Sequence, residues 1–232
     1  MVADLTSAEL ADRSRGLETL AGAYWKPVYT YLRLRWSRSH EEASDLTQEF
    51  FARAVEKESL ALFDSSRARL RTYLRLLVDG LVANELKAAA RQKRGGGATH
   101  LSLDFDAARG ELDAAGALAA ASPEDLFEKE WARSVFTLAV ERLRDVCESR
   151  RKELHYRLFS AYDLEADAEG DRPSYTGLAV RFGIPVTDVT NHLAFARREF
   201  RRLVLDVLRE LTASEAEFRL EARALLGLEM PP

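Results

Sequence analysis

The sequence predicts an all-α fold with two helical domains joined by a flexible linker, the second domain holding a helix-turn-helix. Glycine and proline are scarce, with 12 and 6 among 232 residues. Apolar residues recur at helical spacing along most of the chain, and no segment alternates apolar and polar residues as a half-buried strand would. The length fits two domains of about 100 residues each.

Capping boxes mark several of the expected helix starts. In such a box a Ser or Thr and a Glu three residues later each accept a hydrogen bond from the other's backbone amide. A further start is predicted at Ser122, because this serine precedes a proline at the first helical position and acids follow. The capping boxes are Thr6 with Glu9, Ser39 with Glu42, and Ser214 with Glu217.

Composition divides the chain into two domains. Three consecutive glycines open a segment that is poor in aromatic residues, which predicts a linker at residues 95–121. The linker separates a first domain, residues 5–94, from a second, residues 122–210, and residues 211–232 form a helical extension. An acidic stretch at residues 163–173 predicts an exposed loop within the second domain.

Cysteine and histidine usage argues against several classes of site. A single cysteine, Cys147, excludes a disulfide scaffold and a cysteine-based zinc site. The four histidines lack metal-ligand spacing, and no phosphate-binding loop or activated nucleophile is evident. We therefore expect no enzyme activity, no metal and no cofactor. No apolar run approaches the roughly 18 residues of a membrane span, and no signal peptide is evident, so we expect no membrane insertion and a cytoplasmic location.

Net charge alone, −4, argues against a nucleic-acid partner, but the charge is segregated. Residues 64–94 carry eight basic and three acidic residues, residues 104–130 carry two basic and eight acidic, and residues 191–209 carry five basic and two acidic. Two basic segments joined by an acidic one predict contact with a polyanion at two places. The alternative is that these segments are ordinary solvated helix faces.

The positions of the charges around one predicted helix favour contact with nucleic acid. A helix is predicted from Leu70 to Arg94, with leucines on one face and an uncompensated polar stripe about 15 Å long on another. Positive charge in line with an amide suits contact with phosphates and base edges. The core leucines are Leu70, Leu74, Leu77 and Leu81, and the polar stripe is Asn84, Lys87, Arg91 and Arg94.

A helix-turn-helix is predicted between Tyr175 and Leu205. The first helix ends at Gly183, and the second begins near Pro185. Its core stripe is Val186, Val189, Leu193, Ala196, Phe200 and Leu203. In this motif the start of the second helix meets base edges, which Thr187, Thr190 and Asn191 would do here, and Arg197, Arg198 and Arg201 would reach phosphates. A plain helical hairpin with a basic face remains the alternative, and Asp188 favours it.

Three strings of residues together resemble one family. The segment Asp45–Phe51 closely resembles the polymerase-docking helix of bacterial RNA polymerase sigma factors of the extracytoplasmic-function (ECF) class. Segments at 70–94 and 183–198 resemble the -10 and -35 recognition helices of that class. The resemblance covers residues 15–94 and 122–210, and it implies two domains, called regions 2 and 4.

The resemblance implies a role for each site residue. Docking on the β′ clamp helices of core polymerase falls to Asp45, Leu46, Gln48 and Glu49, and the β flap is a second expected contact. Recognition and melting of the -10 element falls to Phe63, Arg67, Asn84, Lys87, Arg91 and Arg94, where the loop near residues 60–69 captures an unstacked base. Recognition of the -35 element falls to Thr187, Thr190, Asn191, Arg197, Arg198 and Arg201.

Departures from the family pattern leave alternatives open. The reading end of the second helix, Thr190–His192, is less basic than in many relatives. Ser44 stands where an acid is common, so a phosphate on Ser44 or Thr47 would add negative charge to the docking helix, which makes a regulatory kinase a possible partner alongside an anti-sigma factor. The alternative function is a sigma-like regulator that binds DNA or protein without initiating transcription.

Overall fold

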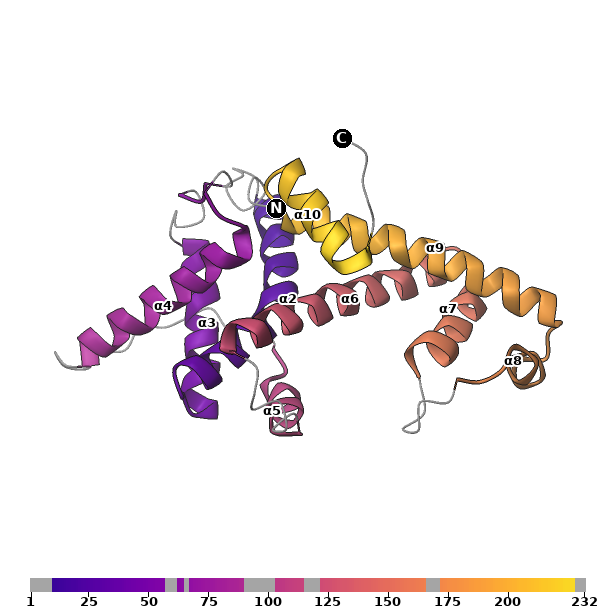
Figure 1. Cartoon of the computed structure of the whole chain (residues 1–232), viewed down its shortest axis with the longest axis horizontal. Coiled ribbons are helices and arrows are strands. Elements are labelled where there is room, and N and C mark those ends of the chain that lie inside the picture. The colour runs from indigo at the N-terminus through magenta and orange to yellow at the C-terminus, as the bar shows by residue number, and fades with distance from the viewer. Residues whose placement is uncertain are drawn as a thin grey trace. The chain divides into compact units, whose positions relative to one another are not determined.

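The computed structural model describes residues 10–56, 62–64, 67–89, 103–114, 122–165 and 172–227. Every regular element in these ranges is a helix, which confirms that the fold is all-α (Figure 1). None of these helices is long and apolar enough to cross a membrane. The chain divides into two compact units: unit 1 is Met1–Val135 with Leu208–Pro232, and unit 2 is Phe136–Val207.

The two units share two long helices. Unit 1 contains α2 (Leu10–Arg35), α3 (His40–Glu56), α4 (Leu70–Ala89), α5 (Phe105–Ala114), α10 (Glu215–Leu226), the first part of α6 (Pro123–Ser149) and the end of α9 (Val186–Leu211). Unit 2 contains the remainder of α6 and α9 with α7 (Glu153–Phe159), the π-helical turn η3 (Ser160–Leu164) and α8 (Tyr175–Phe182). This division differs from the expected boundaries, because the first part of α6 belongs with the N-terminal helices.

The core of unit 1 lies between α2, α3 and α4. Tyr24 and Tyr29 of α2 are buried, as are Leu70 and Leu74 at the predicted core positions of α4. Asp79 of α4 accepts hydrogen bonds from Tyr31 Oη of α2 at 3.3 Å and from Nε1 of Trp36, the residue after α2, at 2.9 Å. Packing and these bonds together fix α4 against α2.

Two of the predicted helix starts have the expected side-chain caps. At α3, Ser39 N donates to Glu42 Oε2 at 2.9 Å and Glu42 N donates to Ser39 Oγ at 3.2 Å, which confirms the capping box. At α6, Asp125 N donates to Ser122 Oγ at 3.0 Å. The box predicted at Thr6 lies outside the described residues.

A helix, α5, occupies part of the segment that was expected to be a linker. Its first residue, Phe105, packs edge-on against Trp25 at 5.5 Å and contacts Tyr29 at 5.6 Å between ring centroids. Lys26 Nζ lies 2.8 Å from a carboxylate oxygen of Glu111. Residues 103–114 are therefore packed against α2, which the low aromatic content of the segment did not predict.

The C-terminal helix α10 packs within unit 1. Ser214 Oγ accepts from Glu217 N at 3.2 Å, as the sequence predicted, and Gly227 ends the helix in the left-handed conformation, with φ 63°. The second half of the predicted capping box is wrong, because the Glu217 carboxylate accepts from Ala213 N and Leu70 N instead of from Ser214 N. The extension is therefore bonded to α4.

Unit 2 is built around the inner faces of α6 and α9. Buried apolar residues from α6, α7, α8 and α9 fill its core, and the Cys147 thiol is buried among them as a free cysteine. The acidic stretch that was expected to be a loop starts inside η3, because Asp163 belongs to this π-helical turn. The core residues are Ala139, Leu143, Leu158, Leu178, Val189, Leu193, Ala196 and Leu203.

Candidate functional site

The outer face of α3 carries the polar residues of the Asp45–Phe51 string. Asp45 is exposed, while Gln48 and Glu49 are half-buried, and Glu49 is ion-paired with Arg53 one turn later. Leu46 was expected to contact a partner, but its side chain is only 3% exposed and packs in the core. Leu46 therefore supports the helix from inside, and the polar side chains are what α3 offers to a partner.

The two hydroxyls considered for phosphorylation differ in accessibility. Thr47 is fully buried and donates to the Ala43 carbonyl at 2.7 Å. Ser44 is half-buried and donates to the His40 carbonyl at 2.7 Å. A phosphate adds up to about two charges that need solvent or cationic partners, so the Thr47 site does not fit one.

The residues before α4 place one aromatic ring and one arginine at the surface. Phe63 is half-buried and lies 5.3 Å from the Tyr73 ring, so it packs against the first turn of α4. The Arg67 side chain is 85% exposed, with its Nε 3.6 Å from a carboxylate oxygen of Asp64. Arg67 is therefore open to a ligand, and the Phe63 ring is open to one in part.

The helix α4 presents a polar face opposite its core. Asn84 and Lys87 are exposed, while the predicted Arg91 and Arg94 lie outside the described residues. A cavity of about 210 Å³ opens between α3 and α4 beside Asn84. Its lining is mostly apolar: Phe50, Arg53, Ala54, Leu76, Leu77, Gly80, Leu81 and Asn84.

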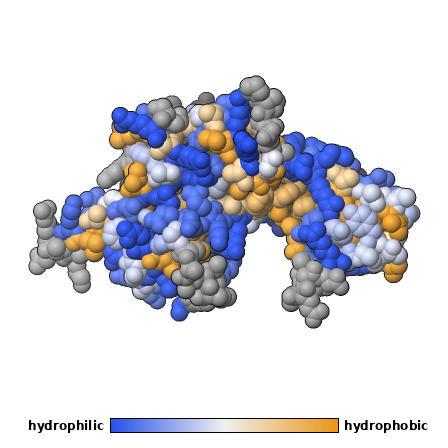
Figure 2. Space-filling model, viewed as in Figure 1, coloured by the Kyte–Doolittle hydropathy of each residue, from blue (hydrophilic) through white to orange (hydrophobic). Residues whose placement is uncertain are grey.

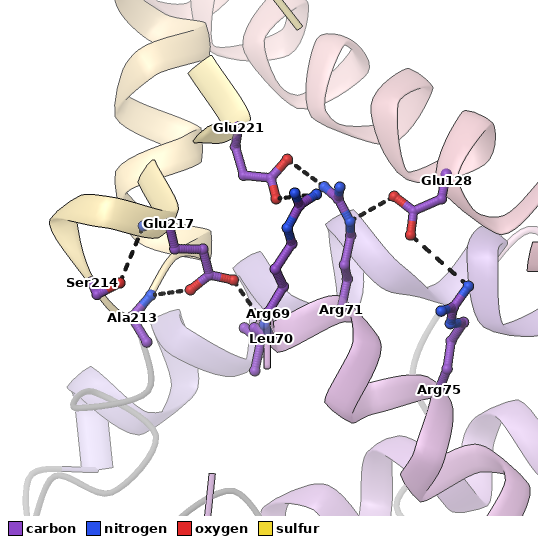
Figure 3. A network of polar contacts seen from close by, with 9 residues as sticks. All are labelled: Arg69, Leu70, Arg71, Arg75, Glu128, Ala213, Ser214, Glu217 and Glu221. Carbon is purple, nitrogen blue, oxygen red and sulfur yellow. Dashed lines mark hydrogen bonds and ion pairs between the residues drawn. The ribbon is translucent and has the colours of Figure 1, made fainter. Parts of the chain in front are cut away.

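Besides Arg67, three arginines of the basic segment at 64–94 are paired with acids from other helices of unit 1. Arg71 is ion-paired with Glu221 of α10 and with Glu128 of α6, whose carboxylate lies 2.6 Å from Arg71 Nε (Figure 3). Arg69 and Arg75 lie 3.5 Å and 4.0 Å from carboxylate oxygens of Glu221 and Glu128 respectively. These charges are therefore partly neutralised before any polyanion arrives.

The turn between α8 and α9 is shaped by caps, of which the sequence predicted the one at Gly183. Ser174 Oγ accepts from Gly177 N at 3.0 Å at the start of α8, and Gly183 ends that helix in the left-handed conformation, with φ 66°. Ile184 N then donates to the Ala179 carbonyl at 3.1 Å, and α9 begins after Pro185. Two helices thus meet at a short glycine-containing turn.

The first turns of α9 expose the residues expected to read bases. Thr187, Thr190 and Asn191 are exposed, and Thr190 Oγ1 donates to the Val186 carbonyl at 3.2 Å. Val186 was expected in the core, but it is 43% exposed, and Val180 on α8 is 80% exposed. Figure 2 shows the hydrophobic colour on this end of unit 2. The start of α9 therefore offers apolar as well as polar contacts.

The arginines further along α9 do not all have the expected role. Arg197 was expected to reach phosphates, but its Nε and Nη2 each donate to the Asp163 carboxylate at 2.9 Å, and its guanidinium lies 5.0 Å from the Tyr162 ring centroid. The bonds to Asp163 raise the pKa of Arg197. Arg197 therefore ties η3 to α9, while Arg198 and Arg201 are exposed.

Two histidines that looked scattered in the sequence stack on each other. The rings of His155 and His192 lie 4.0 Å apart between centroids, inclined by 26°. Burial, reinforced by His192 and Lys152, lowers the pKa of His155 to about 4. No local pattern predicts this pair, because the residues are on α7 and α9. Among the described residues, no group of three or more His, Cys, Asp or Glu side chains could hold a metal ion.

Comparison with known proteins gives one match. A family model described as ECF sigma factor matches residues 26–206, a span that runs from α2 to α9. No curated protein and no solved structure matches the chain. The matched span covers more than half of the 232 residues and includes α3, α4 and the α8–α9 turn. The chain therefore belongs to the ECF sigma factor family, whose members are non-enzymatic proteins of transcription initiation.

Proposed function

We propose that the protein directs promoter-specific transcription by binding core RNA polymerase through unit 1 and the -10 and -35 promoter elements through units 1 and 2 respectively. The observation that carries the proposal is the family match over residues 26–206, because it includes both the docking helix and the α8–α9 turn in one chain. Neither surface alone would distinguish a sigma factor from another DNA-binding protein.

The outer face of α3 is the proposed contact with the β′ clamp helices. Its inner face is buried through Leu46, Phe50 and Phe51, so the helix is a rigid platform. Asp45 points to solvent from this platform, with Gln48 close by in sequence. Carboxylates and amides on a rigid helix suit an interface with basic groups on a partner.

The proposed -10 surface combines the residues before α4 with the polar face of α4. Phe63 supplies an aromatic surface for an unstacked base, and Arg67 supplies positive charge for the strand. Asn84 and Lys87 extend the surface along α4 beside the apolar cavity. Arg91 and Arg94, which lie outside the described residues, are further contacts that the sequence assigns to this surface.

The proposed -35 surface is the start of α9. Asn191 and Thr187 would meet base edges, since an Asn side chain can bond an adenine through two hydrogen bonds. Arg198 and Arg201 are exposed further along the helix and would meet phosphates. Arg197 is left out of this surface because Asp163 already holds it.

Polymerase binding tests the proposal through a matched pair of variants. The Asp45→Asn variant should bind purified core polymerase about tenfold more weakly, because it removes a charged hydrogen-bonding group from the docking face. The control is Asp125→Asn, which changes an exposed acid on another helix of unit 1. Wild-type protein that fails to bind core polymerase would overturn the proposal, and equal affinity for both variants would overturn the assignment of the face.

A further inference from the structure

The helix α10 lies beyond the span that matches the family model, yet it holds the start of α4. The matched residues end at 206, whereas α10 spans Glu215–Leu226. Figure 3 shows Glu217 and Glu221 of α10 directed at the first residues of α4. The C-terminal extension therefore places two carboxylates at the start of α4.

Glu217 caps α4 from a distance of 147 positions in sequence. Its Oε1 accepts from Leu70 N, the first helical amide of α4, at 2.7 Å, and its Oε2 accepts from Ala213 N at 3.0 Å. The residue before the helix is Arg69, whose side chain has only donors and cannot cap. Because the first amides of a helix lack internal partners and carry positive partial charge, a buried carboxylate fits there. Glu217 is 7% exposed.

Glu221 fixes the side chains that flank this amide. It is 2% exposed and is ion-paired with Arg71, and Arg69 Nη1 lies 3.5 Å from its other oxygen. The Arg71 guanidinium also lies 4.5 Å from the ring centroid of Trp131 of α6. Arg71 thus has a carboxylate on each side and a ring against its face.

These contacts set the direction of the first turn of α4, and through it the residues proposed to capture a base. Phe63 packs on Tyr73, and Tyr73 N donates to the Arg69 carbonyl at 3.1 Å within that turn. We infer that Glu217 and Glu221 are positioning residues, which hold the start of α4 so that Phe63 and Arg67 meet the unpaired non-template strand. The inference rests on the proposed function and extends it to a helix outside the matched span.

Burial indicates that α10 stays in place while DNA is bound. Moving α10 away from the rest of unit 1 would expose Phe218 and Ala222, which are now buried. It would also break the ion pair of Glu221 with Arg71, which would keep only its contact with Glu128 of α6 among the described pairs. A removable inhibitor held by surface pairs would lack this burial. The structure therefore favours a permanent support over a latch that must open.

The experiment uses holoenzyme assembled from core polymerase and the full chain. Fork-junction DNA carries the -10 sequence that run-off transcription maps, with each of the four bases in turn at the captured position. The test variants are Glu217→Gln and Glu221→Gln. The control is Glu215→Gln, since Glu215 is an exposed acid of the same helix whose ion pairs are with Arg209 and Arg219.

Both test variants should bind the preferred fork about tenfold more weakly, as expected for loss of a helix cap or a charged bond, and should discriminate less between the four bases. Their affinity for core polymerase should equal that of the control, and hydrogen exchange at the Leu70 amide should accelerate in Glu217→Gln. General destabilisation would instead weaken polymerase binding as well and leave base discrimination intact among the complexes that form. Glu217→Gln keeps one oxygen acceptor, so it remains informative if Glu221→Gln does not fold.

Three results would overturn the inference. Unchanged fork affinity and discrimination in the test variants would show that α10 has no part in base capture. Tighter DNA binding by the variants would show that α10 obstructs DNA. Wild-type protein that fails to bind core polymerase would remove the proposed function and the inference together, whereas the first two results leave the proposed function standing.

Discussion

Replacing Arg71 with Ala should destabilise unit 1 strongly, because it strands two carboxylates. Glu221 is 2% exposed and, among the described residues, would keep only Arg69 as an ion-pair partner, with Arg69 Nη1 3.5 Å away. Glu128 would lose the 2.6 Å contact with Arg71 Nε and keep Arg75 at 4.0 Å. The remaining arginines are farther from the carboxylates, so they replace the lost pairs only in part.

The size of the expected loss in unfolding free energy follows from the burial of these charges. Removing one partner of a buried ion pair costs about 3–5 kcal/mol, and loss of the stacking on Trp131 adds about 0.5–2 kcal/mol. Because Arg69 and Arg75 remain, we expect the free energy of unfolding to fall by about 3 kcal/mol in Arg71→Ala. The double variant Arg71→Ala with Glu221→Gln should recover about 1–2 kcal/mol of this, since it removes the stranded charge.

Urea unfolding followed by tryptophan fluorescence measures this change in unit 1 alone, because Trp25, Trp36 and Trp131 all belong to that unit. Burial raises the pKa of Glu221, and the charge of Arg71 opposes that rise. An acid whose pKa is raised by folding favours the folded state most at a pH below its unfolded pKa, where it is protonated. The stability that Arg71→Ala loses relative to wild type should therefore become smaller as the pH falls toward about 4. A loss of unfolding free energy below about 0.5 kcal/mol in Arg71→Ala at neutral pH would refute this reasoning. A double variant that is no more stable than Arg71→Ala would refute it as well.

Three further predictions concern unit 2. The pKa of His155 is lowered to about 4 in the folded protein, so the unfolded chain takes up a proton first as the pH falls from about 6.5 to 4. We therefore expect the free energy of unfolding of unit 2 to fall by about 1–2 kcal/mol over this range. This loss is smaller than the pKa shift alone would give, because the ring is partly exposed to solvent. Hydrogen exchange should show that His155→Gln flattens this dependence. Arg197→Ala should lower the temperature of thermal unfolding of unit 2, because it breaks the pair with Asp163. Arg198→Ala should leave that temperature unchanged. It should instead reduce by about one the slope of log affinity against log salt concentration for binding of holoenzyme to the promoter. Asn191→Ala should change preference at a single -35 base pair by roughly 1–3 kcal/mol, and an unaltered preference in a binding-site selection would contradict the placement of α9.

Features with local signals could be predicted from the sequence. The core positions Leu70 and Leu74 follow from helical periodicity, and the cap at Ser39 follows from the spacing of Ser39 and Glu42. The end of α8 at Gly183 follows from the left-handed conformation that glycine adopts readily. These features depend on residues within one or two helical turns of each other.

Features that join distant segments could not be predicted in this way. Glu217 has a local capping signal, but its carboxylate bonds the amide of Leu70 because tertiary packing brings α10 to α4. Arg197 looked like a phosphate ligand because its charge was visible in the sequence and its partner Asp163 was not. The helix at 105–114 was missed because one aromatic residue, Phe105, is enough to anchor it on α2.

Run-off transcription with purified core polymerase and a library of genomic fragments tests the central claim most directly. We expect the wild-type chain to produce transcripts that core polymerase alone does not make, with start sites downstream of one shared pair of -10 and -35 sequences. Absence of such transcripts, from a chain that is folded by its tryptophan fluorescence, would contradict the account and leave a sigma-like regulator that does not initiate transcription.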